Sequence, residues 1–144
     1  MKNHIARRRF PVALALLPSL VAAALLAGCS KVPDTLKIGV AQPLTGPLGA
    51  LGQDLLNGVN LAVQELNKDG FMVDGKRVKL EVVAVDDKAD AATGKQVAQQ
   101  LVDAGVVAVI GHLNSGVSIE TAPIYAAKSI PQIAISTNPK FTQL

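Results

Sequence analysis

Hydrophobic and polar positions alternate along most of the chain with two periods, one typical of strands and the other of helices. The segments with the length and apolar content of buried strands are 36–41, 78–85, 106–110 and 132–135. Between the first two, apolar residues recur at steps of three and four, the spacing of one helix face packed on a sheet; they are Leu51, Leu55, Val59, Ala62 and Leu66. A repeated order of strand and helix predicts parallel strands joined by right-handed crossovers.

Turn and capping residues mark the ends of these segments. Asp74-Gly75 predicts a tight turn ahead of the second strand, and Asp90 can cap the N-terminus of a second helix. A third helix is expected over roughly 118–128, since Pro123 is acceptable only near the first turn of a helix. The whole pattern predicts an α/β fold with a doubly wound, parallel, Rossmann-like sheet.

Polar residues follow two neighbouring strands of the predicted sheet. The strand at 106–110 is apolar throughout, so we expect it to be buried on both faces, as parallel strands are. Ligands of open parallel sheets bind in the crevice beyond the carboxyl ends of the strands. The residues expected to border such a crevice are Leu113, Asn114, Ser115 and Gly116 after one strand, and Ser136 and Thr137 after the next.

The first 28 residues differ from the rest of the chain. They carry four basic residues and no acidic one, and the apolar run at 10–28 has no charge. This pattern is typical of a secretory signal. The sequence Leu-Ala-Gly-Cys at 26–29 resembles the bacterial lipoprotein box, which implies cleavage before Cys29, a diacylglycerol on its thiol, and an exported protein held at a membrane by that lipid. An uncleaved membrane anchor is the alternative, and Pro11 and Pro18 disfavour it.

Removing this segment changes the charge of the protein. Of the 14 lysine and arginine residues, ten lie after residue 28, against 11 acidic residues, so the net charge falls from +3 to near −1. Without a basic patch or a tryptophan, the chain lacks the charge and the stacking groups with which proteins bind nucleic acids. Cys29 is the only cysteine, which excludes an intrachain disulfide and a thiolate metal cluster. We expect neither a cofactor nor a metal.

Several short motifs occur in order between residue 36 and the end of the chain. They are Leu36-Lys37-Ile38-Gly39-Val40, Pro43-Leu44-Thr45-Gly46-Pro47, Gly58-Val59, Asp86-Asp87, Gly111-His112-Leu113-Asn114-Ser115-Gly116 and Ser136-Thr137-Asn138-Pro139. Together they resemble the N-terminal lobe of the leucine/isoleucine/valine-binding receptors, the extracytoplasmic solute receptors of branched-chain amino acid ABC transporters. The resemblance implies a lobe of the type I periplasmic binding protein fold, an amino acid as ligand, a permease as partner of the whole receptor, and binding without catalysis.

The same resemblance implies roles for the two polar loops. It places Ser115 and Thr137 at the main-chain groups of the amino acid, flanked by Leu113, Asn114 and Ser136. The chemistry agrees, because Ser115 and Gly116 lie just ahead of a helix, where free N–H groups attract a carboxylate. The carbonyl of Thr137 suits an ammonium. Taken singly, each residue has an ordinary alternative as a helix cap or a turn.

The resemblance also implies parts that this chain lacks. Members of the family are several times longer, and their second lobe supplies an acidic partner for the ammonium and closes the cleft. We therefore divide the chain into a signal at 1–28, a tether at 29–35 and an incomplete lobe at 36–144. A truncated receptor of this kind is expected to bind weakly or not at all by itself. Leu51 stands where members often present an aromatic residue to the ligand, which leaves the side-chain preference open.

A nucleotide- or dinucleotide-binding domain is one alternative. The glycines within 46–52 are similar to a phosphate-binding loop, and Asp86 ends the second strand where a ribose-binding acid could lie. The match is poor, because the glycine spacing differs, Pro47 removes an N–H, and Asp86 comes too late in the sequence.

A hydrolase is the other alternative. It would need a Ser/His/Asp set, but Ser115 lacks the first glycine of a Gly-x-Ser-x-Gly elbow. His112 is expected to be a loop or strand-end residue satisfied by the backbone. Asp86 and Asp87 point to opposite faces of their strand and are expected at a solvated strand end, so they do not form an acid/base pair.

Overall fold

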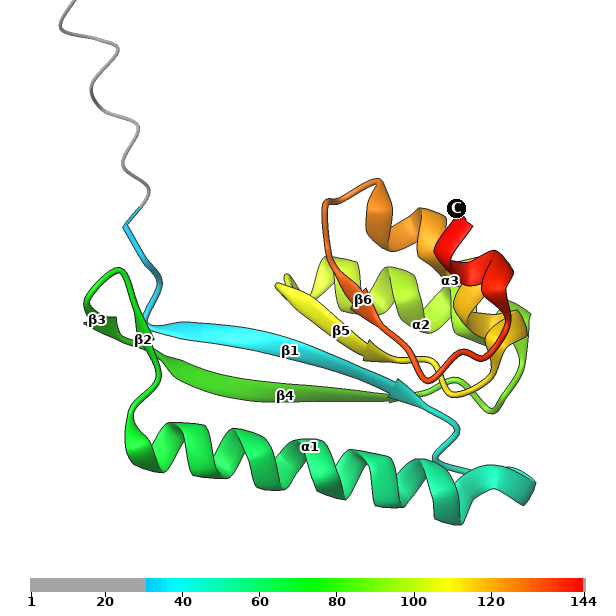
Figure 1. Cartoon of the computed structure of the whole chain (residues 1–144), viewed down its shortest axis with the longest axis horizontal. Helices are drawn as coiled ribbons and strands as arrows, with labels where there is room; N and C mark the ends of the chain where they lie inside the picture. The colour runs from blue at the N-terminus through cyan, green and yellow to red at the C-terminus, as the bar shows by residue number, and fades with distance from the viewer. Residues whose placement is uncertain (1–30, 144) are drawn as a thin grey trace, which may run out of the picture. The chain divides into compact units, whose positions relative to one another are not determined.

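The computed structural model describes residues 31–143; the expected signal and Cys29 lie outside them. Four parallel strands in the order β4-β1-β5-β6 form the main sheet (Figure 1). The strands are β1 (Thr35–Gln42), β4 (Lys79–Asp86), β5 (Ala108–Gly111) and β6 (Gln132–Ile133), and the helices are α1 (Gly49–Asp69), α2 (Ala91–Asp103) and α3 (Ser115–Ala126). Smaller elements are the 3₁₀ segments η2 (Gly46–Leu48) and η3 (Pro139–Gln143) and the hairpin strands β2 (Met72–Val73) and β3 (Lys76–Arg77).

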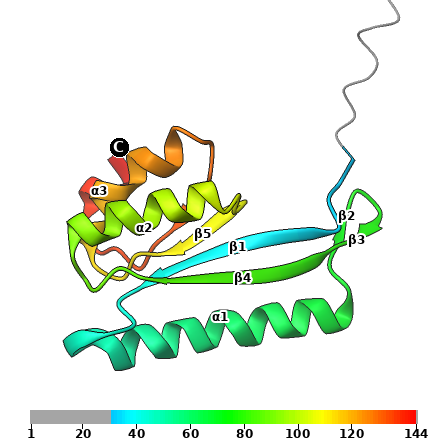
Figure 2. The same ribbon diagram turned by 180° about the vertical axis from the view of Figure 1, so that it is seen from behind.

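The strand order determines which face of the sheet each helix covers. A right-handed crossover places its helix on a face that depends on the direction in which the next strand is added. α1 leads from β1 to β4 in one direction, whereas α2 and α3 lead to β5 and β6 in the other. Accordingly, α1 lies on one face, and α2 and α3 lie together on the opposite face, as both views show (Figure 1 and Figure 2). The predicted doubly wound parallel arrangement is confirmed.

The main core lies between the sheet and the pair of helices α2 and α3. Leu101 of α2, Tyr125 of α3 and Val109 of β5 are fully buried there. Ala98 and Ala41 are equally buried, and their small side chains let α2 approach β1. Since burying a large apolar side chain contributes roughly 1.5–3 kcal/mol, this face supplies a substantial hydrophobic stabilisation.

Within the described residues, no helix covers the other face of β5 and β6. Val106 and Val109 are buried, but Val107 is 43% exposed and Ile133 of β6 is 64% exposed. The expectation that the strand at 106–110 is buried on both faces is therefore wrong for this face. The reason is the topology, because α1 packs on β1 and β4 and leaves the two following strands uncovered.

The apolar stripe of α1 borders the same uncovered region. Four of the five predicted residues line an open hollow between the helix and the sheet: Leu55, Val59, Ala62 and Leu66. Leu66 remains 44% exposed, and the helix buries Leu56 instead. At Gly52, α1 touches the loop after β1, where a Cβ would come within 2.1 Å of the carbonyl oxygen of Pro43. The spacing of the stripe predicted the helix correctly, but not the extent of its burial.

The local turn and cap signals are confirmed. Asp74 and Gly75 both have positive φ, 49° and 77°, as a type I′ turn requires, and they join the hairpin strands β2 and β3. Asp90 accepts a hydrogen bond at its Oδ1 from the backbone N–H of Thr93 at 2.7 Å, which satisfies one free amide of α2. The hydrogen bonds from Thr93 lower the pKa of Asp90.

α3 begins earlier than its proline predicted. The helix starts at Ser115, with Asn114 as its N-cap residue, and Pro123 lies in its interior. Proline removes a hydrogen bond from a helix, but Val117 and Tyr125 on the same helix are buried against the core. Packing of this apolar face compensates for the lost bond. Ser115 is therefore the first residue of α3 and not its cap.

Candidate functional site

The carboxyl ends of β1, β5 and β6 meet at one edge of the sheet. The loop after β1 leads to one face and the loop after β5 to the other, which makes this edge a topological switch point where ligands of doubly wound sheets bind. Gly111 ends β5 with a φ of 147°, and a Cβ there would lie 2.1 Å from the carbonyl oxygen of Ala41 in β1. The close approach of these two strand ends therefore requires glycine.

Ser115 and Thr137 lie in contact at this edge. The backbone N–H of Thr137 donates to the Oγ of Ser115 at 3.2 Å. Because Ser115 and Gly116 open α3, their N–H groups have no partner within the helix. A hydroxyl, helix amides and the backbone of Thr137 thus converge. This arrangement can offer donors to a carboxylate and a carbonyl oxygen to a cation.

The remaining predicted residues lie in the same two loops. Leu113 is half-buried, and Gly116 is exposed in the first turn of α3. Among the described residues, the Oδ1 of Asn114 and the Oγ of Ser136 are buried without a hydrogen-bond partner. Buried polar atoms are normally paired, so these two atoms have capacity for a ligand. The structure brings the two predicted loops together, and their role in binding stays a prediction.

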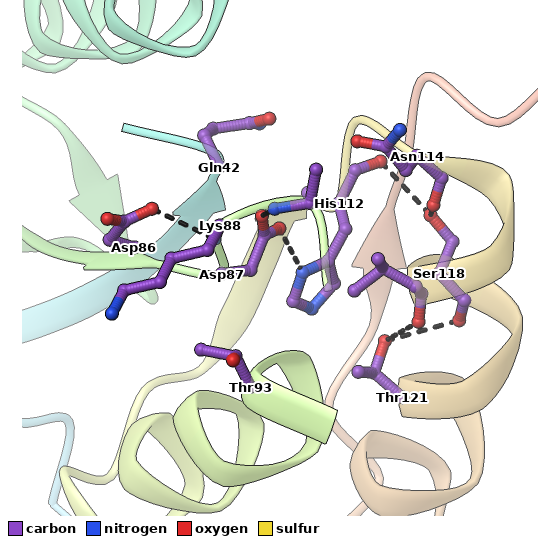
Figure 3. A network of polar contacts seen from close by, with 12 residues as sticks. Gln42, Asp86, Asp87, Lys88, Thr93, His112, Asn114, Ser118 and Thr121 are labelled. Carbon is purple, nitrogen blue, oxygen red and sulfur yellow. Dashed lines mark hydrogen bonds and ion pairs between the residues drawn. The ribbon is translucent and has the colours of Figure 1, made fainter. Parts of the chain in front are cut away.

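A second polar cluster, which we call the His112 cluster, comprises Asp87, His112 and Tyr125. Figure 3 shows Asp87 and the ring of His112 facing each other. Nδ1 of His112 lies 2.6 Å from Oδ2 of Asp87, and Nε2 lies 3.2 Å from the hydroxyl of Tyr125; all three residues are fully buried. Since a carboxylate accepts, Nδ1–H donates to Asp87, and in this tautomer Nε2 accepts from the hydroxyl of Tyr125. Burial raises the pKa of Tyr125, and the charge of Asp87 raises it further, which keeps the phenol protonated.

The His112 cluster corrects two expectations. The ring of His112 is satisfied by two side chains and not by the backbone, and Asp87 is buried and not solvated. The cause is register: Gln42, the last residue of β1, pairs with Asp86, so the residues after β4 and β5 can meet beyond the end of β1. Asp87 and His112 each directly follow a strand, which the sequence indicates, but only the strand order β4-β1-β5 brings them together.

The His112 cluster does not form a catalytic triad. The hydroxyl of Ser118 donates to the backbone oxygen of His112 at 3.0 Å and to that of Asn114 at 3.2 Å, and not to the ring. A nucleophilic serine needs both its base and access to substrate, and Ser118 is fully buried. The cluster instead fixes the backbone that leads into Ser115.

Asp86 ties the loop after β1 to the end of β4. Its carboxylate accepts from the N–H of Leu44 at 2.8 Å, the hydroxyl of Thr45 at 2.6 Å and the N–H of Lys88 at 2.9 Å. Burial raises the pKa of Asp86, but the hydrogen bonds from Thr45, Lys88 and Leu44 outweigh it, and the pKa lies below its ordinary value. A dinucleotide site would need this carboxylate for a ribose, and here both of its oxygens are engaged within the protein.

Two general features of residues 31–143 bear on function. No three His, Cys, Asp or Glu side chains in this range gather closely enough to hold a metal ion. None of the helices in the same range has both the length and the apolar content for crossing a bilayer.

Comparison with known proteins gives a consistent result. Residues 35–143 match the family model described as periplasmic binding protein. The Leu/Ile/Val-binding protein homolog 2 of Brucella abortus (strain 2308) is 47% identical over 107 residues, which cover 74% of this chain and 28% of the relative. The resemblance to Leu/Ile/Val-binding receptors, inferred from the motifs, is confirmed. The chain spans less than a third of the length of this relative.

Solved structures agree in fold. The branched-chain amino acid transporter substrate-binding protein LivJ of Streptococcus pneumoniae, in complex with isoleucine, is 33% identical with a TM-score of 0.69, over 76% of this chain and 31% of that protein. An ABC transporter substrate-binding protein of Desulfitobacterium hafniense, in complex with Leu, is 38% identical with a TM-score of 0.63, over 76% of this chain and 31% of that protein. The described residues therefore have the fold of a type I periplasmic binding protein lobe.

Proposed function

Because the chain belongs to the periplasmic binding protein family, we propose that it forms the N-terminal, ligand-binding lobe of an ABC-transporter receptor for branched-chain amino acids. Because periplasmic binding proteins work outside the cytoplasm, membership of this family makes the domain extracytoplasmic. Support for the ligand class comes from the Brucella relative, named for Leu, Ile and Val, and from the isoleucine and Leu complexes. In this proposal the chain catalyses no reaction, and a permease is the partner of the complete receptor.

The contact between Ser115 and Thr137 carries the proposal. Ser115 Oγ already accepts from the N–H of Thr137 at 3.2 Å, so its own hydroxyl proton is available to a ligand carboxylate. The N–H groups of Ser115 and Gly116 at the start of α3 add two more donors and the positive end of the helix dipole. The carbonyl oxygen of Thr137 accepts from the ammonium. The free buried oxygens of Asn114 and Ser136 complete the polar border.

This lobe alone gives only part of an enclosure. Thr137 is exposed, Ser115 is only half-buried, and the hydrogen bond between them is exposed. Hydrogen bonds to a hydrated ligand compete with water and contribute little net free energy, whereas small-molecule sites bury most of their ligand. Binding of leucine to the isolated chain is therefore expected in the millimolar range or weaker.

Chemical-shift mapping of the labelled full chain tests the proposal. Titration with leucine is expected to shift amide signals of 113–116 and 136–137, with a smaller effect from 4-methylpentanoate, which keeps the carboxylate but lacks the ammonium. Ser115→Ala should weaken the affinity for leucine about threefold, the effect of losing one hydrogen bond that competes with water. Ser129→Ala, an exposed serine beyond the other end of α3, is the control and should leave the titration unchanged.

Two results would contradict the proposal. Shifts confined to other parts of the molecule would reject these loops as the site. An absence of any amide shift at high concentrations of leucine, isoleucine and valine would favour a receptor fragment without binding function. Micromolar binding by the isolated chain, measured by calorimetry, would leave the site standing but refute the need for a second lobe.

The proposal extends to export and anchoring. Residues 1–28 would act as the signal, and Cys29, after cleavage, would carry the lipid that holds the receptor at the membrane surface. Expression in bacteria supplied with radiolabelled palmitate should label the wild-type chain, and Cys29→Ser should remove the label. Labelling that persists in the Cys29→Ser variant would refute the anchor.

A further inference from the structure

We propose that His112 and its two partners, Asp87 and Tyr125, are positioning residues for the ligand: they hold the loop 113–116 in the one arrangement that can bind the carboxylate of an amino acid. The inference deepens the proposed function and rests on it. Because His112 is fully buried, it does not contact a ligand in the open cleft. It acts through the backbone that leads from His112 to Ser115.

The ring of His112 is held at both nitrogens. Nδ1–H donates to Oδ2 of Asp87 at 2.6 Å, and the hydroxyl of Tyr125 lies 3.2 Å from Nε2. The other carboxylate oxygen of Asp87 accepts from the N–H of Ala89 at 2.8 Å, and Ala89 has a left-handed backbone with a φ of 57°. Asp87 is thereby fixed in turn, and the ring cannot rotate without breaking a buried hydrogen bond, which is costly.

The backbone on both sides of the ring is held as well. The hydroxyl of Ser118 lies between the backbone oxygens of His112 and Asn114, at 3.0 and 3.2 Å, and so closes the turn that leads into α3. On the strand side, the backbone oxygen of Gly111 accepts from Nε2 of Gln132 at 3.1 Å. The start of α3, which carries the free N–H groups, therefore has a fixed direction relative to the sheet.

Buried polar side chains gather behind this loop. Within residues 31–143, five polar residues are buried, and four of them lie in or beside the His112 cluster: Asp87, His112, Ser118 and Thr121. Figure 3 shows Ser118 and Thr121 next to each other on α3. Burying a polar group costs free energy unless it is hydrogen-bonded, whereas a satisfied network holds a single geometry. The distribution fits a support for a binding loop better than a core built for stability alone.

A fixed loop matters because the proposed ligand needs several donors at once. The hydroxyl of Ser115 and the N–H groups of Ser115 and Gly116 can meet one carboxylate in only one orientation of the loop, and hydrogen bonds weaken steeply with misalignment. When only a fraction of the molecules has the competent arrangement, the apparent affinity falls by that fraction. Loss of the cluster should therefore lower the affinity for leucine even in molecules that remain folded.

Leucine titration of the labelled full chain, followed through the amide signals of 113–116, tests the inference. Tyr125→Phe keeps the buried ring but removes the hydroxyl at Nε2, and leucine affinity should fall about threefold, as the competent fraction falls to about a third. His112→Asn keeps a donor for Asp87 but loses the contact with Tyr125 and most of the ring. Its affinity for leucine should fall about tenfold, because all the donors of the loop are misplaced together.

The matched control is Leu101→Ala. Leu101 is fully buried on α2 in the same core as Tyr125, and its apolar side chain makes no hydrogen bond. Because it leaves a cavity, this variant should destabilise the fold more than Tyr125→Phe does, as denaturant unfolding measures, yet leave the leucine affinity of the folded molecules unchanged. Val97→Ala, at another buried position of α2, replaces it if Leu101→Ala does not fold.

Motion of the ligand-free loop separates this inference from the proposed function. Nitrogen-15 relaxation, measured on the nanosecond and millisecond timescales, should show added motion of the amides of 113–116 in Tyr125→Phe and none in Leu101→Ala. A wild type that binds no leucine, together with this added motion, would reject the proposed function and keep the cluster as the support of the loop.

Three results would overturn the positioning role. The first is a wild type that binds leucine with an affinity that neither Tyr125→Phe nor His112→Asn changes. The second is an equal loss of affinity in Leu101→Ala, which would mean that the cluster only stabilises the fold. The third is a loop whose motion is the same in Tyr125→Phe as in the wild type.

Discussion

The two faces of the central sheet differ in how completely they are covered, although the same strands form both. Under α2 and α3, Leu101 and Tyr125 are fully buried, and an aspartate and a histidine are buried with them. On the face of α1, Leu66 and Ile133 remain largely exposed. The difference does not follow from strand composition. It follows from the direction of strand addition, which within residues 31–143 places two crossover helices on one face and one on the other.

The largest expected effect is that of Asp87→Ala on the covered face. Removing the Asp87 carboxylate leaves two buried donors, Nδ1–H of His112 and the N–H of Ala89, without an acceptor, and at about 1–3 kcal/mol for each donor this destabilises the protein by roughly 2–6 kcal/mol. Urea unfolding followed by circular dichroism measures the loss of unfolding free energy. Asp87→Asn is the control, because it keeps an oxygen for the N–H of Ala89, which Asp87 binds at 2.8 Å, and it should be less destabilising. A loss below about 1 kcal/mol for Asp87→Ala would show that the covered face does not depend on this pair.

A pair of leucine truncations compares the two faces directly. Leu101→Ala, at a fully buried position, should destabilise the protein by about 2–5 kcal/mol, through lost burial and the cavity left behind. Leu66→Ala, at a position that is 44% exposed, should destabilise it by about 1 kcal/mol or less. The denaturant midpoints of the two variants give the two losses of unfolding free energy, provided that the dependence of unfolding free energy on denaturant concentration is unchanged. Similar losses of stability in both variants would mean that the hollow between α1 and the sheet is closed in solution.

Asp86 offers a smaller effect that depends on pH. Its hydrogen bonds to the loop after β1 hold its pKa below the ordinary value, so the stability it contributes is present above about pH 4 and is lost as pH falls through the lowered folded pKa. At neutral pH, Asp86→Asn should destabilise the protein by roughly 1 kcal/mol, a figure reduced for partial solvent exposure. The difference in unfolding free energy between Asp86→Asn and the wild type should become smaller in acid. Denaturant unfolding of both proteins at neutral and at acid pH measures this difference. A difference that is the same at acid and neutral pH would contradict this role.

The smallest expected effect is that of Ile133→Thr on the open face. Because this side chain is 64% exposed, the unfolding free energy should change by no more than about 0.5 kcal/mol. Binding of the dye ANS, which reports exposed apolar surface, should decrease in the same variant. A large loss of stability would indicate that β6 is covered in solution.

The sequence predicted the elements well because their signals are local. The stripe of α1, the Asp74-Gly75 turn and the Asp90 cap each depend on residues within a few positions of one another. The prediction that Ser115 and Thr137 lie near each other used only the parallel order of the strands. Their place in the structure agrees with that order, whereas their binding of a ligand stays untested.

The features that the sequence did not predict depend on distant residues. The pairing of Asp87 with His112 requires β4 and β5 to flank β1, and no local pattern encodes that neighbourhood. The start of α3 was misplaced because the proline rule is local, whereas burial of Val117 and Tyr125 overrides it. Exposure of Val107 could not be read from an apolar run, since composition does not reveal which face lacks a helix.

Tyr125 is the only tyrosine of the chain, which contains no tryptophan. Its buried ring, stacked near His112 with centroids 6.2 Å apart, is therefore the dominant near-ultraviolet chromophore of the protein. Intrinsic fluorescence and near-ultraviolet circular dichroism will report changes in the packing around this one ring. They will be almost insensitive to changes in structure on the α1 face of the sheet. A spectroscopist would thus obtain a site-selective optical probe without introducing any label.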